Sequence, residues 1–142
     1  MATITGANAT LVMTVDQIFP NGFQVQGFAV DDSFRTDAVS QVEVLMGVDG
    51  RLSAGFVFNP TKMTIMLQAD SPSVDAFESV RLNQFGAVDA FRWDGTITLA
   101  NGYQYNLTNG YMTSAHSFPD VKKVLQPLPY EITFESVSSS PL

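Results

Sequence analysis

The residues of this chain that could carry out chemistry are few and lie far apart in the sequence. The single histidine, His116, lies in a Ser/Pro-containing segment, where an exposed side chain is more common than a catalytic one. The chain has no cysteine, so disulfides and thiolate metal sites are excluded. Asp31 and Asp32 are adjacent carboxylates, but the regularly spaced oxygen ligands and distal glutamate of a calcium loop are missing. The sequence therefore predicts no metal, no cofactor and no catalytic site.

Trp93, with Phe91 and Arg92 beside it, could form a binding platform, because aromatic rings stack on sugars and bases. The favoured interpretation is a tryptophan buried in the core beside the helix. A glycine-rich phosphate loop and a Gly-x-Ser-x-Gly nucleophile elbow are both missing. A hydrolase that uses carboxylates from distant strands stays open as a weaker alternative.

Length and charge narrow the class of protein further. A chain of 142 residues with 45% hydrophobic residues is typical of a single globular domain with its own core, here 1–142. The net charge of −7 repels phosphate backbones and does not indicate a specific nucleic-acid binder. No apolar run of about 18 residues is present, and the N-terminus lacks a signal-peptide pattern, so we expect no membrane span or secretion signal.

One segment, at about 72–85, has the signals of an α-helix. Ser71 can cap it, Pro72 suits the first helical position, and Gly86 can supply a left-handed end. The spacing of its apolar residues predicts a face that packs on a sheet. The residues on this predicted face are Val74, Phe77, Val80, Leu82 and Phe85.

The rest of the chain has the alternation and turn residues of β-strands. The predicted strands are 10–16, 23–30, 39–46, 51–58, 62–69, 96–100, 103–107, 111–115 and 130–137. The predicted turns are Pro20-Asn21-Gly22, Gly47–Gly50, Asn59-Pro60-Thr61, Asn101-Gly102 and Asn109-Gly110. We expect a flexible N-terminal arm at 1–9, a polar connection at 31–38, a C-terminal tail at 138–142, and no central strand around Pro127 and Pro129.

These elements predict a mainly β fold: two packed antiparallel sheets or a small β-barrel, with one helix. Alternation places the apolar residues of 42–46 and 52–58 in the core, with Gln41 and Glu43 facing outward. In the last strand, Glu131 and Glu135 face outward. Several second faces are polar but uncharged, which is consistent with either plain solvation or contact with neighbouring subunits or a confined channel.

The second half of the chain resembles the tail tube proteins of long-tailed bacteriophages. The motifs that carry this resemblance are the tyrosine-rich stretch Gly102–Ser114, then Lys122–Pro127 and Glu131–Glu135. The layout of strands, a mid-chain helix after Ser-Pro, a hairpin and a final strand is also similar to that family.

The resemblance implies a structural virion protein whose hexameric rings stack into a hollow tail tube. Its partners would be itself, a sheath or terminator, a baseplate or tip protein and a tape measure protein, and DNA would pass through without specific binding. It would be assembled in the host cytoplasm and located in the virion tail. An acidic lumen wall would repel DNA phosphates, which suits the net charge of −7.

The resemblance also implies two sets of functional residues. Four outward-facing residues are candidates for the lumen wall: Gln41, Glu43, Glu131 and Glu135. The loop between rings has two candidate locations, 31–38 and 47–51. The residues in these loops that are candidates for inter-ring contacts are Asp31, Asp32, Phe34, Asp49 and Arg51. A β-sandwich module that binds carbohydrate or protein, through Trp93 or the tyrosine-rich hairpin, is the alternative function.

Overall fold

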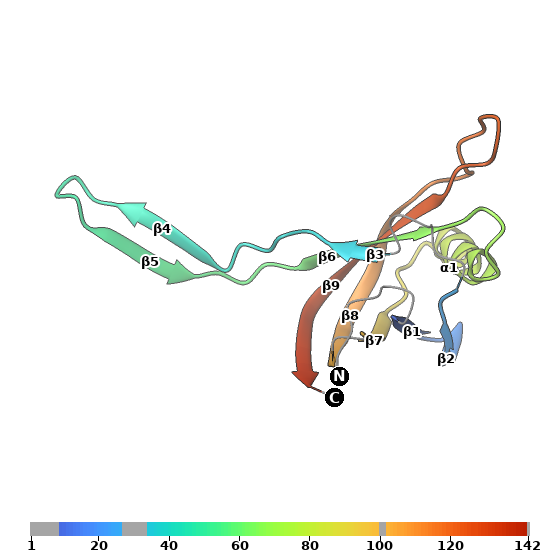
Figure 1. The fold of residues 1–142 in the computed structure, drawn as a ribbon, viewed down its shortest axis with the longest axis horizontal. Coiled ribbons are helices and arrows are strands. Elements are labelled where there is room, and N and C mark those ends of the chain that lie inside the picture. Colours follow the sequence, from blue (N-terminus) through green and yellow to red (C-terminus); the bar gives the residue numbers. More distant parts are fainter. Residues whose placement is uncertain (1–8, 27–33, 100–101, 142) are drawn as a thin grey trace.

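The computed structural model describes residues 9–26, 34–99 and 102–141 (Figure 1). Most of the predicted N-terminal arm, together with Asp31, Asp32 and Asn101, lies outside the described residues. Within them the chain forms an antiparallel seven-stranded sheet, a separate two-stranded sheet and one α-helix, α1 (Ser73–Ala87). The predicted mainly β class with a single helix is therefore confirmed.

The seven-stranded sheet has the order β2-β1-β7-β8-β9-β6-β3. Its strands are β1 (Thr10–Val15), β2 (Phe19–Gln24), β3 (Phe34–Thr36), β6 (Thr61–Leu67), β7 (Trp93–Thr98), β8 (Tyr103–Ala115) and β9 (Leu128–Pro141). The second sheet is the hairpin of β4 (Val42–Met46) and β5 (Leu52–Phe56). It extends away from the rest of the molecule, which we call the body (Figure 1).

The core lies between α1 and one face of the seven-stranded sheet. The predicted alternation is confirmed in three strands, whose inward residues are buried: Leu11, Met13 and Val15; Met63, Ile65 and Leu67; Tyr130, Ile132 and Phe134. Phe77 of α1 is 0% exposed, and its ring centroid lies 5.2 Å from that of Trp93 and 4.9 Å from that of Tyr130. Trp93 is thus a core residue beside α1, which confirms the favoured interpretation, and it does not form a stacking platform.

Polar contacts at its first turns fix α1 to the body. The Ser71 hydroxyl accepts the Ser73 N–H at 3.2 Å, and the Ser73 hydroxyl accepts the Gln26 N–H at 2.8 Å. Farther along, Glu78 accepts the Tyr130 hydroxyl at 2.8 Å and pairs with Arg81. Burial, together with this acceptor, raises the pKa of the Tyr130 phenol well above its ordinary value.

The end of the helix differs from the prediction. Gly86 lies inside α1, and the left-handed residue that ends it is Val88, with φ of 52°. The side chains of Leu82 and Phe85 are exposed, so they do not widen the buried face as predicted. The buried positions of α1 are Ser73, Phe77 and Val80, which form a narrower stripe than the sequence suggested.

Two predicted turns are irregular positions inside strands. Pro20-Asn21-Gly22 belongs to β2, opposite a register shift in β1, and the chain reverses at 16–18 instead. Asn109 has φ of 53° within the continuous strand β8, at a register shift against β7. A bulge needs the same backbone freedom as a tight turn, so both patterns use the same residue types.

The final strand is longer than predicted. β9 runs to Pro141, with Ser138, Ser139 and Ser140 paired to β8, so the expectation of a tail from 138 is wrong for these residues. β9 is also central, between β8 and β6, although Pro129 lies in it. Pro129 is the second residue of β9, near the strand start where a missing N–H is best tolerated.

The β4–β5 hairpin with its connections, residues 37–60, is an arm that projects from the body. The chain continues from β5 to β6 without reversing direction, so Asn59-Pro60-Thr61 is not a turn (Figure 1). The predicted core positions in this region are also wrong, because every residue of β4 and β5 is exposed. The predicted apolar residues do share one face of the hairpin, but within the described residues nothing covers the arm.

Candidate assembly surfaces

One face of the arm is entirely apolar. Three cross-strand pairs lie on it: Val42 with Phe56, Val44 with Ala54, and Met46 with Leu52. Val44 is 59% exposed, and Phe58, which contacts Phe56 edge to face at 5.0 Å, is 92% exposed. Isolated two-stranded hairpins are marginal in water, and contiguous exposed apolar patches mark interaction sites. This face therefore has the composition of an interface.

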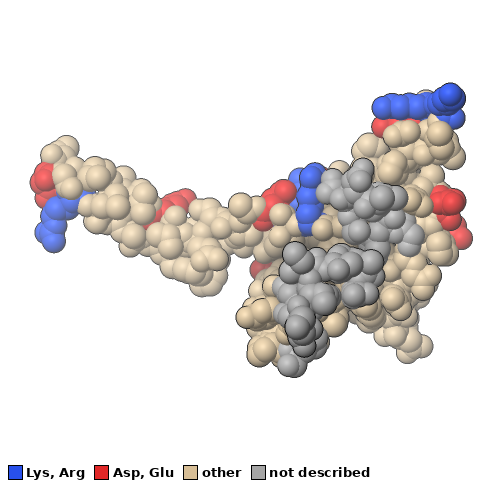
Figure 2. Space-filling model, viewed as in Figure 1, with Lys and Arg blue, Asp and Glu red and all other residues tan. Residues whose placement is uncertain are grey.

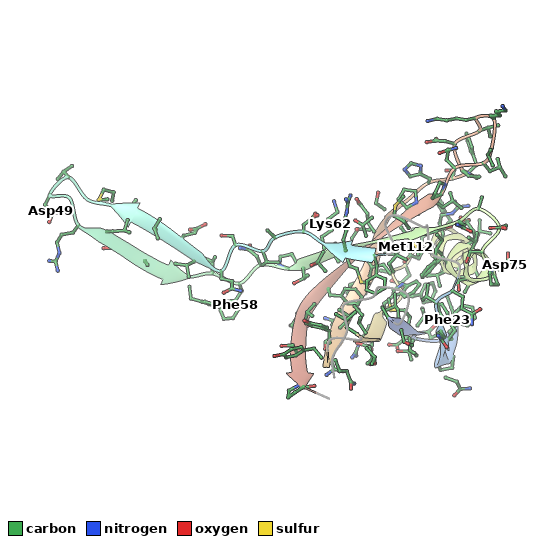
Figure 3. All side chains as sticks on the ribbon, viewed as in Figure 1. Phe23, Asp49, Phe58, Lys62, Asp75 and Met112 are labelled. Carbon is green, nitrogen blue, oxygen red and sulfur yellow. The ribbon has the colours of Figure 1, made fainter. Side chains whose placement is uncertain are left out.

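The arm ends in the predicted Asp-Gly turn, which is confirmed. Gly50 adopts φ of 84° and donates its N–H to the Gly47 carbonyl at 3.0 Å. The Asp49 carboxylate accepts the Arg51 N–H at 3.1 Å. Asp49 thus lies at the far end of the arm, and Phe58 lies at the base of the β4–β5 hairpin (Figure 3). Two of the candidates for inter-ring contacts, Asp49 and Arg51, therefore lie at the end of the arm farthest from the body.

The sheet face opposite α1 carries the other group of candidates. Glu131 forms an ion pair with Lys62 of β6 at 3.3 Å. Glu135 accepts a hydrogen bond from the Asn109 side chain at 2.8 Å. A third carboxylate on this face is Asp94 of β7, which forms an ion pair with Arg92 at 3.2 Å and accepts the Asn109 N–H at 2.9 Å. The face is polar, and its negative charges are partly balanced by cations.

The structure separates the four predicted lumen residues. Glu131 and Glu135 share the outward sheet face, while Gln41 and Glu43 belong to the arm. Glu43 lies across from Gly55, on the face of the hairpin opposite the apolar pairs. Phe34 of β3 is partly buried against the core, which uses its ring inside the subunit. Sequence reasoning missed Asp94 and Lys62, since only strand pairing brings them to this face.

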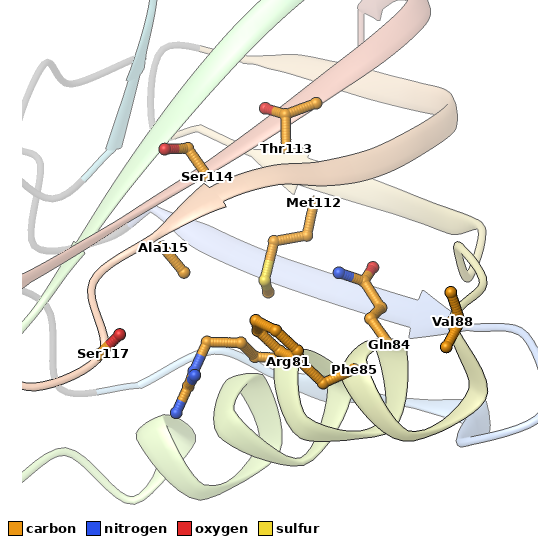
Figure 4. A pocket seen from close by; sticks show the side chains of 9 residues that line it. All are labelled: Arg81, Gln84, Phe85, Val88, Met112, Thr113, Ser114, Ala115 and Ser117. Carbon is orange, nitrogen blue, oxygen red and sulfur yellow. The ribbon is translucent and has the colours of Figure 1, made fainter.

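A groove lies between α1 and the end of β8 (Figure 4). Its volume is about 510 Å³. One wall is formed by α1 and its C-cap residue, and the other by the end of β8 and the start of the next loop: Arg81, Gln84, Phe85 and Val88; Met112, Thr113, Ser114, Ala115 and Ser117. The loop 116–127 continues from one end and exposes Phe118, Val121 and Val124. Basic side chains gather at the outer end of this loop, where the sequence has Lys122 and Lys123 (Figure 2).

Chemistry other than assembly has little support among the described residues. In 9–26, 34–99 and 102–141, no three His, Cys, Asp or Glu side chains are grouped closely enough to hold a metal ion. The helix in this part of the chain is too short and too polar to cross a membrane. The exposed tyrosines Tyr103 and Tyr111 lie on β8.

The chain matches the family described as tail fiber protein gp32 over residues 2–138, and it belongs to that family. The description of this family names a tail protein. The search of curated proteins found no match.

Solved structures show the same fold. One is a chain of the anti-feeding prophage (AFP) baseplate, 6-fold symmetrised, with a TM-score of 0.61 at 13% identity over 99% of this chain and 98% of that one. Another comes from the PVC sheath-tube complex of an extracellular contractile injection system in its extended state, with a TM-score of 0.53 and 18% identity over 93% of this chain and 88% of that one. A chain of the AFP tube terminating cap has a TM-score of 0.53 and 12% identity over 100% of this chain and 93% of that one. The tail-tube-like fold expected from the resemblance is confirmed.

Proposed function

We propose that this protein is a tail tube subunit whose hexameric rings stack into the conduit for genome delivery. The apolar face of the arm carries this proposal, because a chain that exposes such a surface needs a partner to cover it. In a tube, the neighbouring copies of the chain would cover this surface. The tail-tube-like fold and the family of tail proteins support the same conclusion.

The seven-stranded sheet suits the wall of such a tube. Among the described residues it has two open edges. One is β2, and the other is formed by the short strand β3 and the part of β6 that β3 does not cover. Main-chain pairing between copies at these edges would close the sheets into a ring. α1 covers one face, so the face with Glu131 and Glu135 is the one free to line a lumen. DNA would pass along this polar face without specific binding.

The proposed partners follow from this location in the particle. They are further copies of the chain, a sheath or terminator, a baseplate or tip protein, and a tape measure protein. Structures with this fold come from a baseplate and from sheath-tube and terminator complexes, which supports this set. Assembly would take place in the host cytoplasm and the product would be part of the virion tail.

The test uses two substitutions on opposite faces of the arm. Concentrated wild-type protein should form rings or tubes in negative-stain micrographs, with virion components added if required. Val44→Asp puts a carboxylate on the apolar face and should abolish assembly, because burying an unpaired charge is costly. Ser53→Asp puts the same charge on the opposite face and should leave assembly intact. A strictly monomeric wild type would contradict the proposal.

The family description is the one observation that favours a second location, in a tail fiber. Antibody labelling of intact particles separates the two. Antibody that binds along the tail shaft only after the sheath is removed would support a tube subunit. Antibody that binds the distal fibers of untreated particles would support a fiber protein.

A further inference from the structure

Two groups of exposed apolar side chains lie at opposite ends of the molecule. One is the arm face with Val44 and Phe56, and the other is the groove with Phe85 and Val88 and its loop 116–127. In the view with the longest axis horizontal, the arm occupies one end, and α1 and this loop occupy the other (Figure 1). The two surfaces therefore cannot meet within one chain.

The dimensions of the two surfaces agree. Along α1 the groove runs from Arg81 to Val88, which is about 10 Å at the helical rise per residue. The three apolar cross-strand pairs, from Val42 to Met46 along β4, span about 13 Å at the rise of a strand. The groove offers the exposed rings and methyl groups of Phe85 and Val88 to this apolar face.

The charges are also complementary. The arm, 37–60, contains Asp37, Glu43 and Asp49 against Arg51, a net charge of −2. The loop 116–127 at the groove contains one carboxylate, Asp120, and two lysines, a net charge of +1. Opposite net charges favour encounter of the arm with this loop, while two arms or two loops would repel each other.

We infer that the groove between α1 and β8 receives the apolar arm face of a second copy of this chain. The inference rests on the proposed self-assembly and names the receiving surface. A contact between two different surfaces of identical chains is heterologous, so it propagates head to tail and closes into a ring or continues as a stack. It would bury both exposed apolar groups in a single interface.

Cysteine crosslinking tests this directly, because the natural chain has no cysteine. Ala54→Cys lies at the centre of the apolar arm face, and Phe85→Cys lies in the groove. The two single variants are mixed, assembled and treated with a short bismaleimide. We expect a crosslinked dimer that contains one copy of each variant. Both positions are exposed, so neither change removes core packing.

Ser53→Cys mixed with Phe85→Cys is the matched control, since Ser53 is adjacent in β5 but points to the opposite face. This pair should lose most of the dimer band. Equal bands from both mixtures, or no band in samples where microscopy shows rings or tubes, would overturn the groove assignment and leave the proposed function standing. Monomeric samples without any band would overturn both.

Discussion

The body and the arm use the same alternating pattern with opposite results. Met63, Ile65 and Leu67 recur at every second position of β6 and are buried, because α1 and neighbouring strands cover them. Val42, Val44 and Met46 of β4 alternate in the same way and are exposed. Apolar alternation thus specifies a face that must be covered, but not whether the cover comes from the same chain.

Truncating an apolar side chain to alanine should give the largest difference in stability between the body and the arm. Phe77→Ala removes a fully buried ring at the centre of the body core and should lower the free energy of unfolding by about 3–5 kcal/mol. Val44→Ala on the arm should change the stability of the monomer by less than about 0.5 kcal/mol, as exposed substitutions usually do. Chemical denaturation of unassembled protein measures both, and an unchanged midpoint for Phe77→Ala would show that α1 does not pack as described.

Glycine-to-alanine substitutions in the body and on the arm should differ in the same direction, but by a smaller free energy. Gly110 lies against the Phe134 ring, so a Cβ there would collide with it, and Gly110→Ala should destabilise the body by about 1–3 kcal/mol. Gly55 on the arm has open space around it, so Gly55→Ala should have little effect on monomer stability. Thermal unfolding of the two variants side by side provides the comparison, and equal losses would contradict it.

The hydrogen bond between helix and sheet should make the body sensitive to high pH. The pKa of Tyr130 is raised in the folded state, so its contribution is complete below the ordinary tyrosine value near 10.0 and is lost as pH rises above it. Tyr130→Phe should cost about 1 kcal/mol at neutral pH and flatten the alkaline decline. Denaturation midpoints between neutral and alkaline pH test this, and an identical decline in the variant would refute the assignment.

Charge reversal should have the smallest effect on stability, but on the outward sheet face, unlike on the arm, it should slow the passage of the genome. Glu135→Lys on the outward sheet face would repeat a positive charge around a lumen, so DNA ejection should slow, and more so at low salt. Glu131→Lys should act in the same direction, because it also leaves Lys62 without its partner. Glu43→Lys, on the arm, should leave ejection unchanged once tubes are confirmed by microscopy. Normal ejection by both sheet variants would place this face outside the channel.

Local features of this fold were predictable from the sequence because they depend on neighbouring residues. The helix after Ser71-Pro72, the inward faces of β1, β6 and β9, and the Asp-Gly turn of the arm each follow from spacing and backbone preference. The number and alternation of strands likewise fixed the mainly β class.

Other features were decided by tertiary contacts, because equal local patterns permit two outcomes. Asn109-Gly110 suits a turn or a bulge, and the long pairing of β8 with β9 selects the bulge. Leu82 and Phe85 have helical spacing, yet their side chains are exposed, because spacing alone does not show which part of a helix face another element covers. The apolar residues of β4 and β5 recur at every second position, which predicts a buried face. This spacing contains no information on which molecule supplies the opposing surface.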